Sequence, residues 1–456
     1  VFTMEETIAN NLAATVKKIK DSFPFDSKQP VEFKLDNGIS KSLLKTKLKN
    51  LKHLIDTKEY NEKNMKFFPA AINELINLMN NNGVYDISDL WQEYIAVMKI
   101  LSEKNSMLND SEFKKQKVVL ASFPRTFFLQ FAGPCNSSCV FCSRGHDYEH
   151  FILSIFKERI ENKIAVQLAL AQQFIFTGSG EFLRLTDWCK ILNYFEERYP
   201  YIDKMFSTNG SSLRPEVIDL ITSHKSRYLI HASLHASNPA LHRAITRMEN
   251  FENILSQIKY ILERRKKNNN VRINLLFVAT VLNIDDLPNF VRLARQLGVD
   301  GVIVNYNYIY VPAQKYLSCY FKQDLANRMF EEARQTAQEI GIDINLPPAF
   351  GQNSYPQRGI CRELWSQIMF DAQGHVLPCD ASGDCNLQLK DNLYFSVIWN
   401  SEYYVRMRQE LVESGHTACY QCCHRANPAT VNLFSSHVIH RGREGEKIDE
   451  SWEDNF

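Results

Sequence analysis

The sequence Cys135-Asn-Ser-Ser-Cys139-Val-Phe141-Cys142 places three cysteines at CxxxCxxC spacing, directly after the apolar run Phe127-Phe128-Leu129-Gln-Phe131. Three thiolates can hold three corners of a [4Fe–4S] cube and leave the fourth iron open to another molecule. A structural zinc site needs four protein ligands, and no fourth Cys or close His completes a set here, since His146 and His150 are merely nearby. The spacing therefore favours an iron–sulfur site over zinc.

The CxxxCxxC spacing, with an aromatic residue before the last cysteine, resembles the radical S-adenosylmethionine (SAM) superfamily. The resemblance implies that Cys135, Cys139 and Cys142 are the catalytic cluster ligands, and that Phe141 borders the cofactor. In that family the open iron chelates SAM, and an electron from the cube cleaves the sulfonium to a 5′-deoxyadenosyl radical. A reductant such as flavodoxin or ferredoxin is then expected as a partner.

The composition of the 456 residues, 45% hydrophobic and 23% charged, is ordinary for a soluble protein of two to three domains. A net charge of +1 gives no overall attraction to nucleic acid or anionic lipid. We see no signal peptide and no apolar run of about eighteen residues, so we expect no membrane span and a cytoplasmic protein. In a reducing compartment, the eleven cysteines are better interpreted as metal ligands and buried thiols than as disulfides.

Residues 1–120 have helical periodicity and lack strand signals, which predicts a helical N-terminal domain. The apolar stripes are Ile8, Leu12, Val16 and Ile19; Leu44, Leu48, Leu51 and Ile55; Ile72, Leu75, Ile76 and Met79; and Leu90, Tyr94, Val97, Met98 and Leu101. Its role is open between a lid, a docking platform and a dimer interface.

Residues 121–346 alternate short apolar strands with amphipathic helices, which is typical of βα units on a parallel sheet. The predicted strands are Phe127–Phe131, Phe174–Thr177, Lys204–Ser207, Leu229–Leu234, Ile273–Ala279 and Val302–Asn305, and Leu287–Leu297 is a predicted helix. Six units are too few to close an eight-stranded barrel, so we expect an α/β fold with an open, partial (β/α)6 barrel. Active sites of such folds lie at the carboxyl ends of the strands.

The second predicted strand is followed by Thr177-Gly178-Ser179-Gly180-Glu181. Glycines let a backbone approach a ligand closely, although a bare Gly-x-Gly is more often a tight turn. The stretch resembles the family's Gly-Gly-Glu motif, which holds the SAM amino group, with Ser179 in place of the first glycine. The resemblance implies cofactor contacts from Gly178, Ser179, Gly180 and Glu181.

The third and fourth predicted strands end at Ser207 and Ser233, both in stretches familiar from the family. By that resemblance Ser207 lies at the cofactor, and Ser233 contacts the ribose or carboxylate of SAM. A downstream arginine can pair with the carboxylate bidentately, and Arg247 is the candidate, with Arg243 as the alternative. His235 and His242 could carry protons, but an isolated His is more often a packed core group.

The sixth predicted strand ends in polar and aromatic residues, where a substrate would face the cluster. Asn305, Asn307 and Tyr308 can orient a substrate, although a surface loop explains them nearly as well. Cys189 and Cys319 lie in apolar contexts and are predicted to be buried thiols.

Residues 347–423 form a second cysteine-rich stretch after a proline- and glycine-containing linker. Ile368, Phe370 and Val376 around Gly374 predict a hairpin, and a helix is expected to open near Ile398 and to end near Leu411. Taken without the upstream CxxxCxxC motif, Cys361, Cys379, Cys419 and Cys422 could form a zinc ribbon. With the upstream motif, the stretch is similar to the twitch or SPASM-type extension of radical SAM enzymes, which implies one auxiliary [4Fe–4S] cluster. Its ligands would be Cys361, Cys379, Cys419 and Cys422, with Cys385 and Cys423 as substitutes, and residues 424–456 are predicted to be a charged tail.

The function we predict is that of a radical SAM oxidoreductase, in which the auxiliary cluster accepts an electron from a substrate radical. Two substrate classes remain open: a sugar-like, cyclitol-like or carrier-bound small molecule, and a ribosomally made peptide. The helical N-terminal region does not look like a peptide-recognition domain, which favours the small molecule. The non-enzymatic alternative is an iron–sulfur electron carrier or redox sensor.

Overall fold

The computed structural model describes twelve stretches of the chain, which contain every feature discussed below. They are residues 37–81, 88–131, 134–142, 153–176, 180–265, 270–307, 312–347, 349–350, 361–371, 374–378, 387–388 and 398–413. The predicted stripe at Ile8 to Ile19 and the predicted tail at 424–456 lie outside them.

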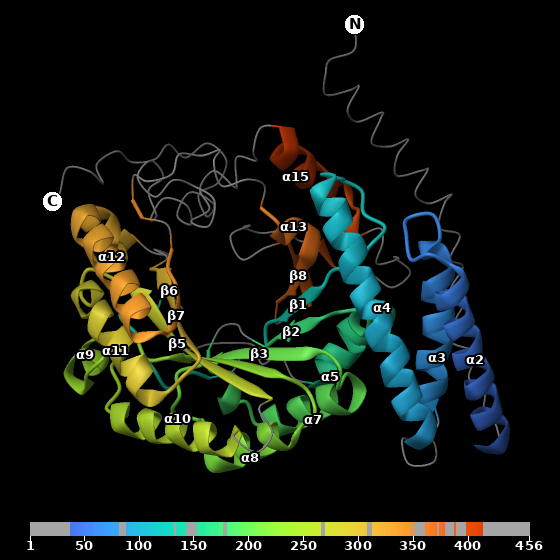
Figure 1. The fold of residues 1–456 in the computed structure, drawn as a ribbon, viewed down its shortest axis with the longest axis horizontal. Helices are drawn as coiled ribbons and strands as arrows, with labels where there is room; N and C mark the ends of the chain where they lie inside the picture. Colours follow the sequence, from blue (N-terminus) through green and yellow to red (C-terminus); the bar gives the residue numbers. More distant parts are fainter. Residues whose placement is uncertain are drawn as a thin grey trace, which may run out of the picture.

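One curled ten-stranded sheet forms the centre of the molecule, in the order β10-β9-β8-β1-β2-β3-β4-β5-β6-β7 (Figure 1). The strands are β1 (Thr126–Leu129), β2 (Gln173–Ile175), β3 (Asp203–Thr208), β4 (Tyr228–Ser233), β5 (Val271–Ala279), β6 (Gly301–Tyr306), β7 (Asp343–Asn345), β8 (Gln367–Phe370), β9 (His375–Leu377) and β10 (Leu387–Gln388). Pairing is parallel from β8 through β1 to β7, and β9 and β10 are antiparallel additions at one edge.

The six predicted strands are all present as β1 to β6, each within two residues of its predicted bounds. The parallel α/β sheet of the prediction is therefore confirmed. The sheet is wider than six strands, because β7 joins β6 and β8 joins β1. The three-residue β7, with an exposed residue on either side of one half-buried residue, carries too short a pattern to be recognised in the sequence.

Helices cover the outer, convex face of the sheet (Figure 1). They are α5 (Leu153–Phe156), a π-helical turn (Lys157–Glu161), α6 (Asn162–Ala169), α7 (Trp188–Arg198), α8 (Pro215–Ser223), α9 (Pro239–Thr246), α10 (Phe251–Arg265), α11 (Leu287–Leu297) and α12 (Gln323–Ile340). The helix predicted at Leu287–Leu297 is confirmed as α11.

One of the two alternating sets of strand residues is fully buried against these helices. Phe174 of β2 packs on Phe195 of α7 with ring centroids 5.0 Å apart, and Phe277 of β5 packs on Phe290 of α11 at 5.0 Å. Burying an aromatic side chain of this size stabilises the fold by about 1.5–3 kcal/mol. This set therefore forms the core that attaches the helices to the sheet.

The other set of strand residues faces the concave side and is only half-buried. Phe128, Ile175, Met205 and Leu229 belong to it and lie in register across β1 to β4. Closed barrels fill this space with packed layers of side chains. Here the side chains on the concave side remain partly exposed.

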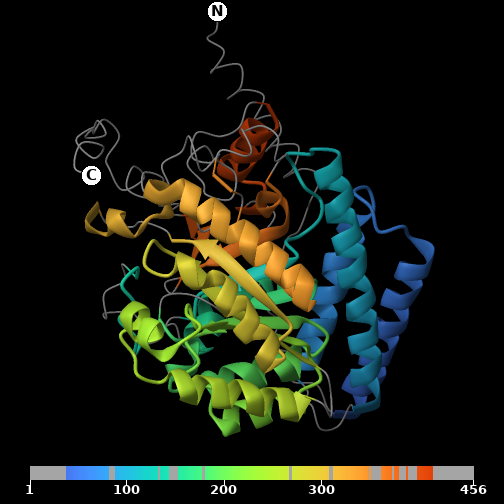
Figure 2. The same ribbon diagram turned by 60° about the vertical axis from the view of Figure 1, so that its left-hand side comes forward.

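The N-terminal helices α2 (Asn37–Thr57), α3 (Phe68–Asn81) and α4 (Ser88–Lys114) lie side by side on one flank of the sheet (Figures 1 and 2). The described part of residues 1–120 is thus helical, as predicted. Helix α4 connects to the sheet through buried polar side chains: Asn109 Nδ2 donates to the carbonyl of Trp365 at 2.5 Å, and Ser102 Oγ donates to that of Ala171 at 2.5 Å.

The C-terminal hairpin is formed by β8 and β9, as predicted, and is followed in the chain by α15 (Glu402–Glu413). The hairpin was expected within a separate small domain, but β8 extends the main sheet by pairing with β1. The short α13 (Glu363–Ser366) leads into β8 and packs on α15. Hydrogen bonds between β1, β8 and their neighbours therefore make the hairpin continuous with the barrel.

The segment before β1 is enclosed between α4 and α15. Asn400 donates to the carbonyl of Leu120 and accepts from its N–H, both at 2.8 Å. The buried Arg408 donates to the carbonyls of Leu364 at 2.9 Å and Val118 at 3.0 Å. Burial lowers the pKa of Arg408 to about 9, and these carbonyl contacts give its guanidinium polar partners.

None of the described helices is both long and apolar enough to cross a membrane.

Candidate active site

The cysteine loop, residues 135–142, follows β1 and lies at the carboxyl end of the sheet. Cys135 and Cys139 are half-buried, whereas Cys142 is exposed. The three thiols lie close enough for their charges to interact. The pKa of Cys139 is raised to about 11. Burial is the main cause, and negative charge on Cys142 and Cys135 contributes to the same shift. The structure thus brings the three predicted cluster ligands together.

Backbone and hydroxyl contacts fix the cysteine loop to the end of α9. Val140 N–H donates to the carbonyl of Ile245 at 2.9 Å, and Ser137 Oγ donates to the carbonyl of Thr246 at 2.9 Å. The same Ser137 hydroxyl lies 3.1 Å from Cys139 Sγ. These carbonyls belong to the last turn of α9, where a helix leaves carbonyl groups without an internal partner. The helix end therefore holds the loop in place.

The thiols suit a multi-iron cluster better than a single ion. Burial raises the pKa of Cys135, against the effect of the Ser137 N–H that donates to its sulfur at 3.5 Å. Metal ligation requires the thiolate, so iron must supply the charge that stabilises it. In the described part of the chain, no three His, Cys, Asp or Glu side chains converge on one ion. A cube does not require this, because each of its cysteines binds a different iron.

Glu181 lies after β2 and is 2% exposed. One carboxylate oxygen accepts from Thr208 Oγ1 at 2.7 Å, and the other accepts from the Asn209 N–H at 2.7 Å. Burial raises its pKa, and these hydrogen bonds oppose that shift by stabilising the charged form. The structure places Glu181 beside the loop after β3, with both oxygens engaged.

Asn209 links Glu181 to the cysteine loop. Its Nδ2 donates to Asn136 Oδ1 at 2.9 Å and lies 3.9 Å from Cys135 Sγ. Its Oδ1 accepts from the N–H of Ser211 at 3.0 Å, which fixes the amide orientation. The carboxyl ends of β1, β2 and β3 are thereby joined by a chain of polar contacts.

The two predicted serine positions lie on the concave side. Ser207 and Ser233 are the half-buried, inward-facing residues near the ends of β3 and β4. Gly180 has a φ of 100°, a conformation that favours glycine. Gly178 and Ser179 lie outside the described residues.

His235 follows β4 and packs against Phe141 of the cysteine loop. It is 3% exposed and has a φ of 62°, which is rare for a residue other than glycine. Its Nδ1 accepts from the N–H of Val278 at 3.1 Å, and its ring meets Phe141 edge-on with centroids 5.1 Å apart. Burial lowers its pKa to about 3, so the ring is neutral at physiological pH. The contact places the predicted cofactor-bordering Phe141 directly against the end of β4.

The two candidate arginines lie at the exposed end of α9. Arg247 is exposed, with a φ of 62° at the helix C-cap. Arg243 forms an ion pair with Glu249 at 2.8 Å, in which both side chains are exposed. Arg247 therefore has the freer guanidinium of the two among the described contacts. His242 is a packed core group, which is the more common role of an isolated histidine. Its Nδ1 forms a hydrogen bond with the Leu234 carbonyl at 2.8 Å.

Two of the three predicted substrate residues are described, and Tyr308 lies outside the described stretches. Asn305 is exposed on the concave side of β6, whereas Asn307 is 4% exposed and its Nδ2 has no hydrogen-bond partner. A buried amide without a partner costs free energy unless a ligand satisfies it. Gln314, for which no sequence pattern indicated a role, donates to the Val140 carbonyl at 3.2 Å.

Of the four expected auxiliary-cluster ligands, only Cys361 belongs to the described stretches, where it is half-buried. Cys379, Cys419 and Cys422, and the substitutes Cys385 and Cys423, lie outside them.

Cys319 is buried, as predicted. The same prediction is wrong for Cys189, which is half-buried because it lies in the first turn of α7, near the surface.

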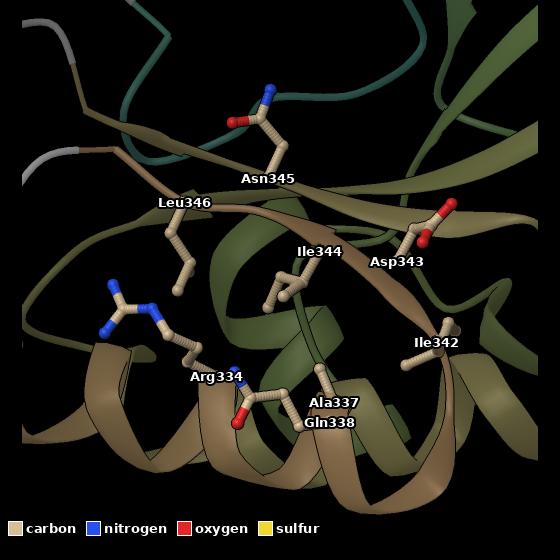
Figure 3. A pocket seen from close by; sticks show the side chains of 8 residues that line it. All are labelled: Arg334, Ala337, Gln338, Ile342, Asp343, Ile344, Asn345 and Leu346. Atoms are coloured by element: carbon tan, nitrogen blue, oxygen red, sulfur yellow. The ribbon is translucent and has the colours of Figure 1, made fainter.

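A surface pocket of about 460 Å³ lies elsewhere, between α12 and β7 (Figure 3). Ile344 and Leu346 point toward α12, while Asp343 and Asn345 point to the other side of the strand (Figure 3). The pocket therefore lies on the helix side of the sheet and is separate from the cysteine loop.

Residues 130–308 match the family model of the Radical SAM superfamily. Over 200 residues the chain is 26% identical to the "Probable GTP 3′,8-cyclase" of Methanocaldococcus jannaschii, a match that covers 43% of this chain and 62% of that protein. The chain thus matches less than two thirds of the length of this relative.

The fold is similar to that of SuiB from Streptococcus suis. SuiB bound to S-adenosylmethionine superposes with a TM-score of 0.53 at 16% identity, covering 79% of this chain and 82% of SuiB. SuiB bound to the precursor peptide SuiA gives a TM-score of 0.52 at 14% identity, covering 80% of this chain and 88% of SuiB.

Proposed function

With a radical SAM domain at residues 130–308 as the premise, we propose that this protein is an enzyme that cleaves S-adenosylmethionine at a [4Fe–4S] cluster held by Cys135, Cys139 and Cys142. When bound, the cluster and SAM supply a 5′-deoxyadenosyl radical that abstracts hydrogen from a substrate. The observation that carries the proposal is the placement of three cysteines on one loop at the carboxyl end of the sheet.

The other residues of the site position the cofactors. Ser137 holds Cys139 against α9, and Asn209 holds the start of the cysteine loop through Asn136. Glu181 fixes Asn209 through its N–H. We assign Glu181 this positioning role in addition to the contact with the SAM amino group that the family motif implies.

Cofactor contacts are proposed for the polar groups that surround the cysteine loop. They are Phe141, Gly178, Ser179, Gly180, Glu181, Ser207, Ser233 and Arg247. The exposed guanidinium of Arg247 suits the SAM carboxylate, because planar guanidinium groups bind carboxylates bidentately. Asn305, Asn307 and Tyr308 are proposed to contact the substrate, and the unpartnered Nδ2 of Asn307 supports that role.

We further propose a net oxidation of a sugar-like, cyclitol-like or carrier-bound substrate. An auxiliary cluster on Cys361, Cys379, Cys419 and Cys422 would accept an electron, and flavodoxin or ferredoxin would supply the one that starts the reaction. The pairing of β8 with β1 supports this arrangement, because it places β8, which follows Cys361 by only a few residues, beside the first strand of the barrel.

A ribosomally made peptide is the second candidate substrate. SuiB, which shares the fold, is known bound to a precursor peptide.

The non-catalytic alternative is an electron carrier or redox sensor. Binding of SAM in equilibrium dialysis distinguishes a radical SAM enzyme from an electron carrier or a redox sensor, since neither of the latter needs a SAM site.

The experiment is anaerobic reconstitution followed by reduction with dithionite in the presence of SAM. The expected product is 5′-deoxyadenosine, and Cys135→Ala should abolish it because one corner of the cube is lost. Cys189→Ala is the matched control, since Cys189 belongs to α7 and not to the cysteine loop. Deoxyadenosine formation that survives Cys135→Ala, or that never occurs, would overturn the proposal.

A further inference from the structure

A row of polar side chains crosses the concave side of the sheet. Ser207 of β3, His231 of β4 and Asn274 of β5 are in register, and all three are half-buried. Residues paired across parallel strands point to the same face, about 4.8 Å apart. Ser233 lies two residues beyond His231, so His231 and Asn274 are one layer deeper in the barrel than Ser233, while Ser207, which is also a proposed SAM contact, is level with them.

His231 has a buried ring nitrogen, Nε2, without a hydrogen-bond partner. The other described histidines within the barrel are bonded: His224 to Tyr228 at 2.7 Å, His235 to Val278 and His242 to Leu234. A buried polar atom without a partner is costly and is rare in a folded protein. Burial lowers the pKa of His231 to about 4, so its ring is neutral near pH 7 and provides one donor and one acceptor.

Asn274 is the neighbour of His231 in register, and its side-chain oxygen leans toward β6. Its partner on β6 is Gly301, where an added Cβ would lie 3.3 Å from Asn274 Oδ1. The absence of a side chain at Gly301 thus leaves room for the amide. His231 and Asn274 are therefore neighbouring polar residues on the same layer.

The layer beneath the row is apolar. Phe128, Ile175, Met205 and Leu229 are half-buried and form a continuous floor across four strands. Charged side chains on this face lie mainly at β5 and β7: the exposed Arg272 is in register with Leu229 of the floor, and Asp343 is in register with Gly301. Asp203, at the start of β3, pairs with Arg227. Around Ser207 and His231, this face thus offers hydrogen bonds without charge.

We propose that His231 and Asn274 bind a neutral hydroxyl group of the substrate, so that the substrate part held at the radical site is a polyol, above the apolar floor. This inference rests on the proposed function, whose substrate it specifies.

The spacing of the two side chains favours a hydroxyl group. A hydroxyl oxygen donates one hydrogen bond and accepts others, and its hydrogen rotates to suit either ring tautomer. The backbones at His231 and Asn274 are about 4.8 Å apart, so one oxygen bound above them is within reach of both side chains. A phosphate or carboxylate would instead need a cation, and the row contains none.

The test is chemical modification of His231 by diethyl pyrocarbonate, which attacks neutral imidazole nitrogen. The reconstituted protein with bound SAM is treated, and modification of each histidine is followed by mass spectrometry. His231 should react faster than His235, whose Nδ1 is bonded. myo-Inositol should slow the reaction of His231 at least about threefold at twice its Kd, by simple occupancy.

Asn274→Leu should remove the protection by myo-inositol while His231 remains reactive, and Asn289→Leu, on the exposed face of α11, is the matched control. Deoxyadenosine formation in the same samples reports on the proposed function separately. The inference is overturned if His231 reacts no faster than His235, or if myo-inositol does not protect it. It is also overturned if myo-inositol 1-phosphate or N-acetylglycinamide protects as well or better, since these represent anionic and peptide substrates.

Discussion

The backbone N–H of Asn209 donates a hydrogen bond to Glu181 Oε2 at 2.7 Å, which joins the ends of β2 and β3. Asn209 in turn reaches Asn136 in the cysteine loop. The carboxylate of Glu181, a proposed SAM contact, therefore also belongs to a chain of polar contacts that reaches the cysteine loop. Substitutions at Glu181 should affect SAM binding more than the cluster, because no cluster ligand is changed.

Glu181→Ala should weaken SAM binding by at least about tenfold, because the proposed charge-assisted hydrogen bond to the SAM amino group, worth about 1.5–3 kcal/mol, would be lost. Glu181→Gln should have a smaller effect, since it keeps the shape and one acceptor. The measurements are the Kd for SAM and the visible absorption of the cluster, which should be retained in both variants. Unchanged SAM affinity in Glu181→Ala would remove Glu181 from the site.

Ser137→Ala should lower the yield of the reconstituted cluster, because the hydroxyl contacts both Cys139 Sγ and the Thr246 carbonyl. The loss of one such hydrogen bond costs about 1 kcal/mol. Ser138→Ala is the control, since Ser138 is exposed and contacts Thr246 through its backbone N–H. Iron and sulfide analysis of both variants provides the comparison, and equal iron contents would show that the hydroxyl is dispensable.

The iron content should be roughly eight atoms per chain after anaerobic reconstitution, corresponding to two cubes. Replacing both Cys361 and Cys379 by Ala should reduce it to roughly four. Cys419→Ala should keep deoxyadenosine formation and lose the oxidised product, because the second cluster would act only after hydrogen abstraction. Four iron atoms in the unmodified protein, or zinc retained at stoichiometry, would contradict the second cluster.

Protein stability should fall with acid between pH 6.5 and 4 in part because of His231. Its folded-state pKa is about 4, depressed from 6.5, so in this window the unfolded chain binds a proton that the folded chain does not. The free energy of unfolding therefore rises with pH, by up to about 1.4 kcal/mol per pH unit for one proton. His231→Leu should show a shallower slope in urea denaturation, whereas the exposed His53→Leu should not. Identical slopes for His231→Leu and the unmodified protein would mean that His231 titrates normally.

Asn109→Leu should lower the free energy of unfolding by about 1–3 kcal/mol, because it leaves the buried Trp365 carbonyl and Ser122 hydroxyl without this donor. Met107→Ala, 71% exposed on the same helix, should have little effect. Chemical denaturation of both variants measures the difference. A neutral Asn109→Leu would show that α4 is only loosely attached to the sheet.

The sequence by itself determined the strands β1 to β6 and the position of the cysteine loop. Strand and helix periodicities are local, and three thiols within eight residues are close in any fold. The same locality explains why α11 was predicted at its observed bounds. Ser207 and Ser233 could be placed near strand ends for this reason, without knowledge of how the strands pair.

Only the tertiary structure decided which distant residues meet. The pairing of β8 with β1 joins residues about 240 positions apart, and no local pattern records such a register. His231 was not selected from the sequence, because a lone histidine in an apolar strand does not show whether its ring nitrogens have hydrogen-bond partners. The curl of the sheet turns His231 and Asn274 inward and leaves one imidazole nitrogen without a partner, and this follows from the geometry of the whole barrel.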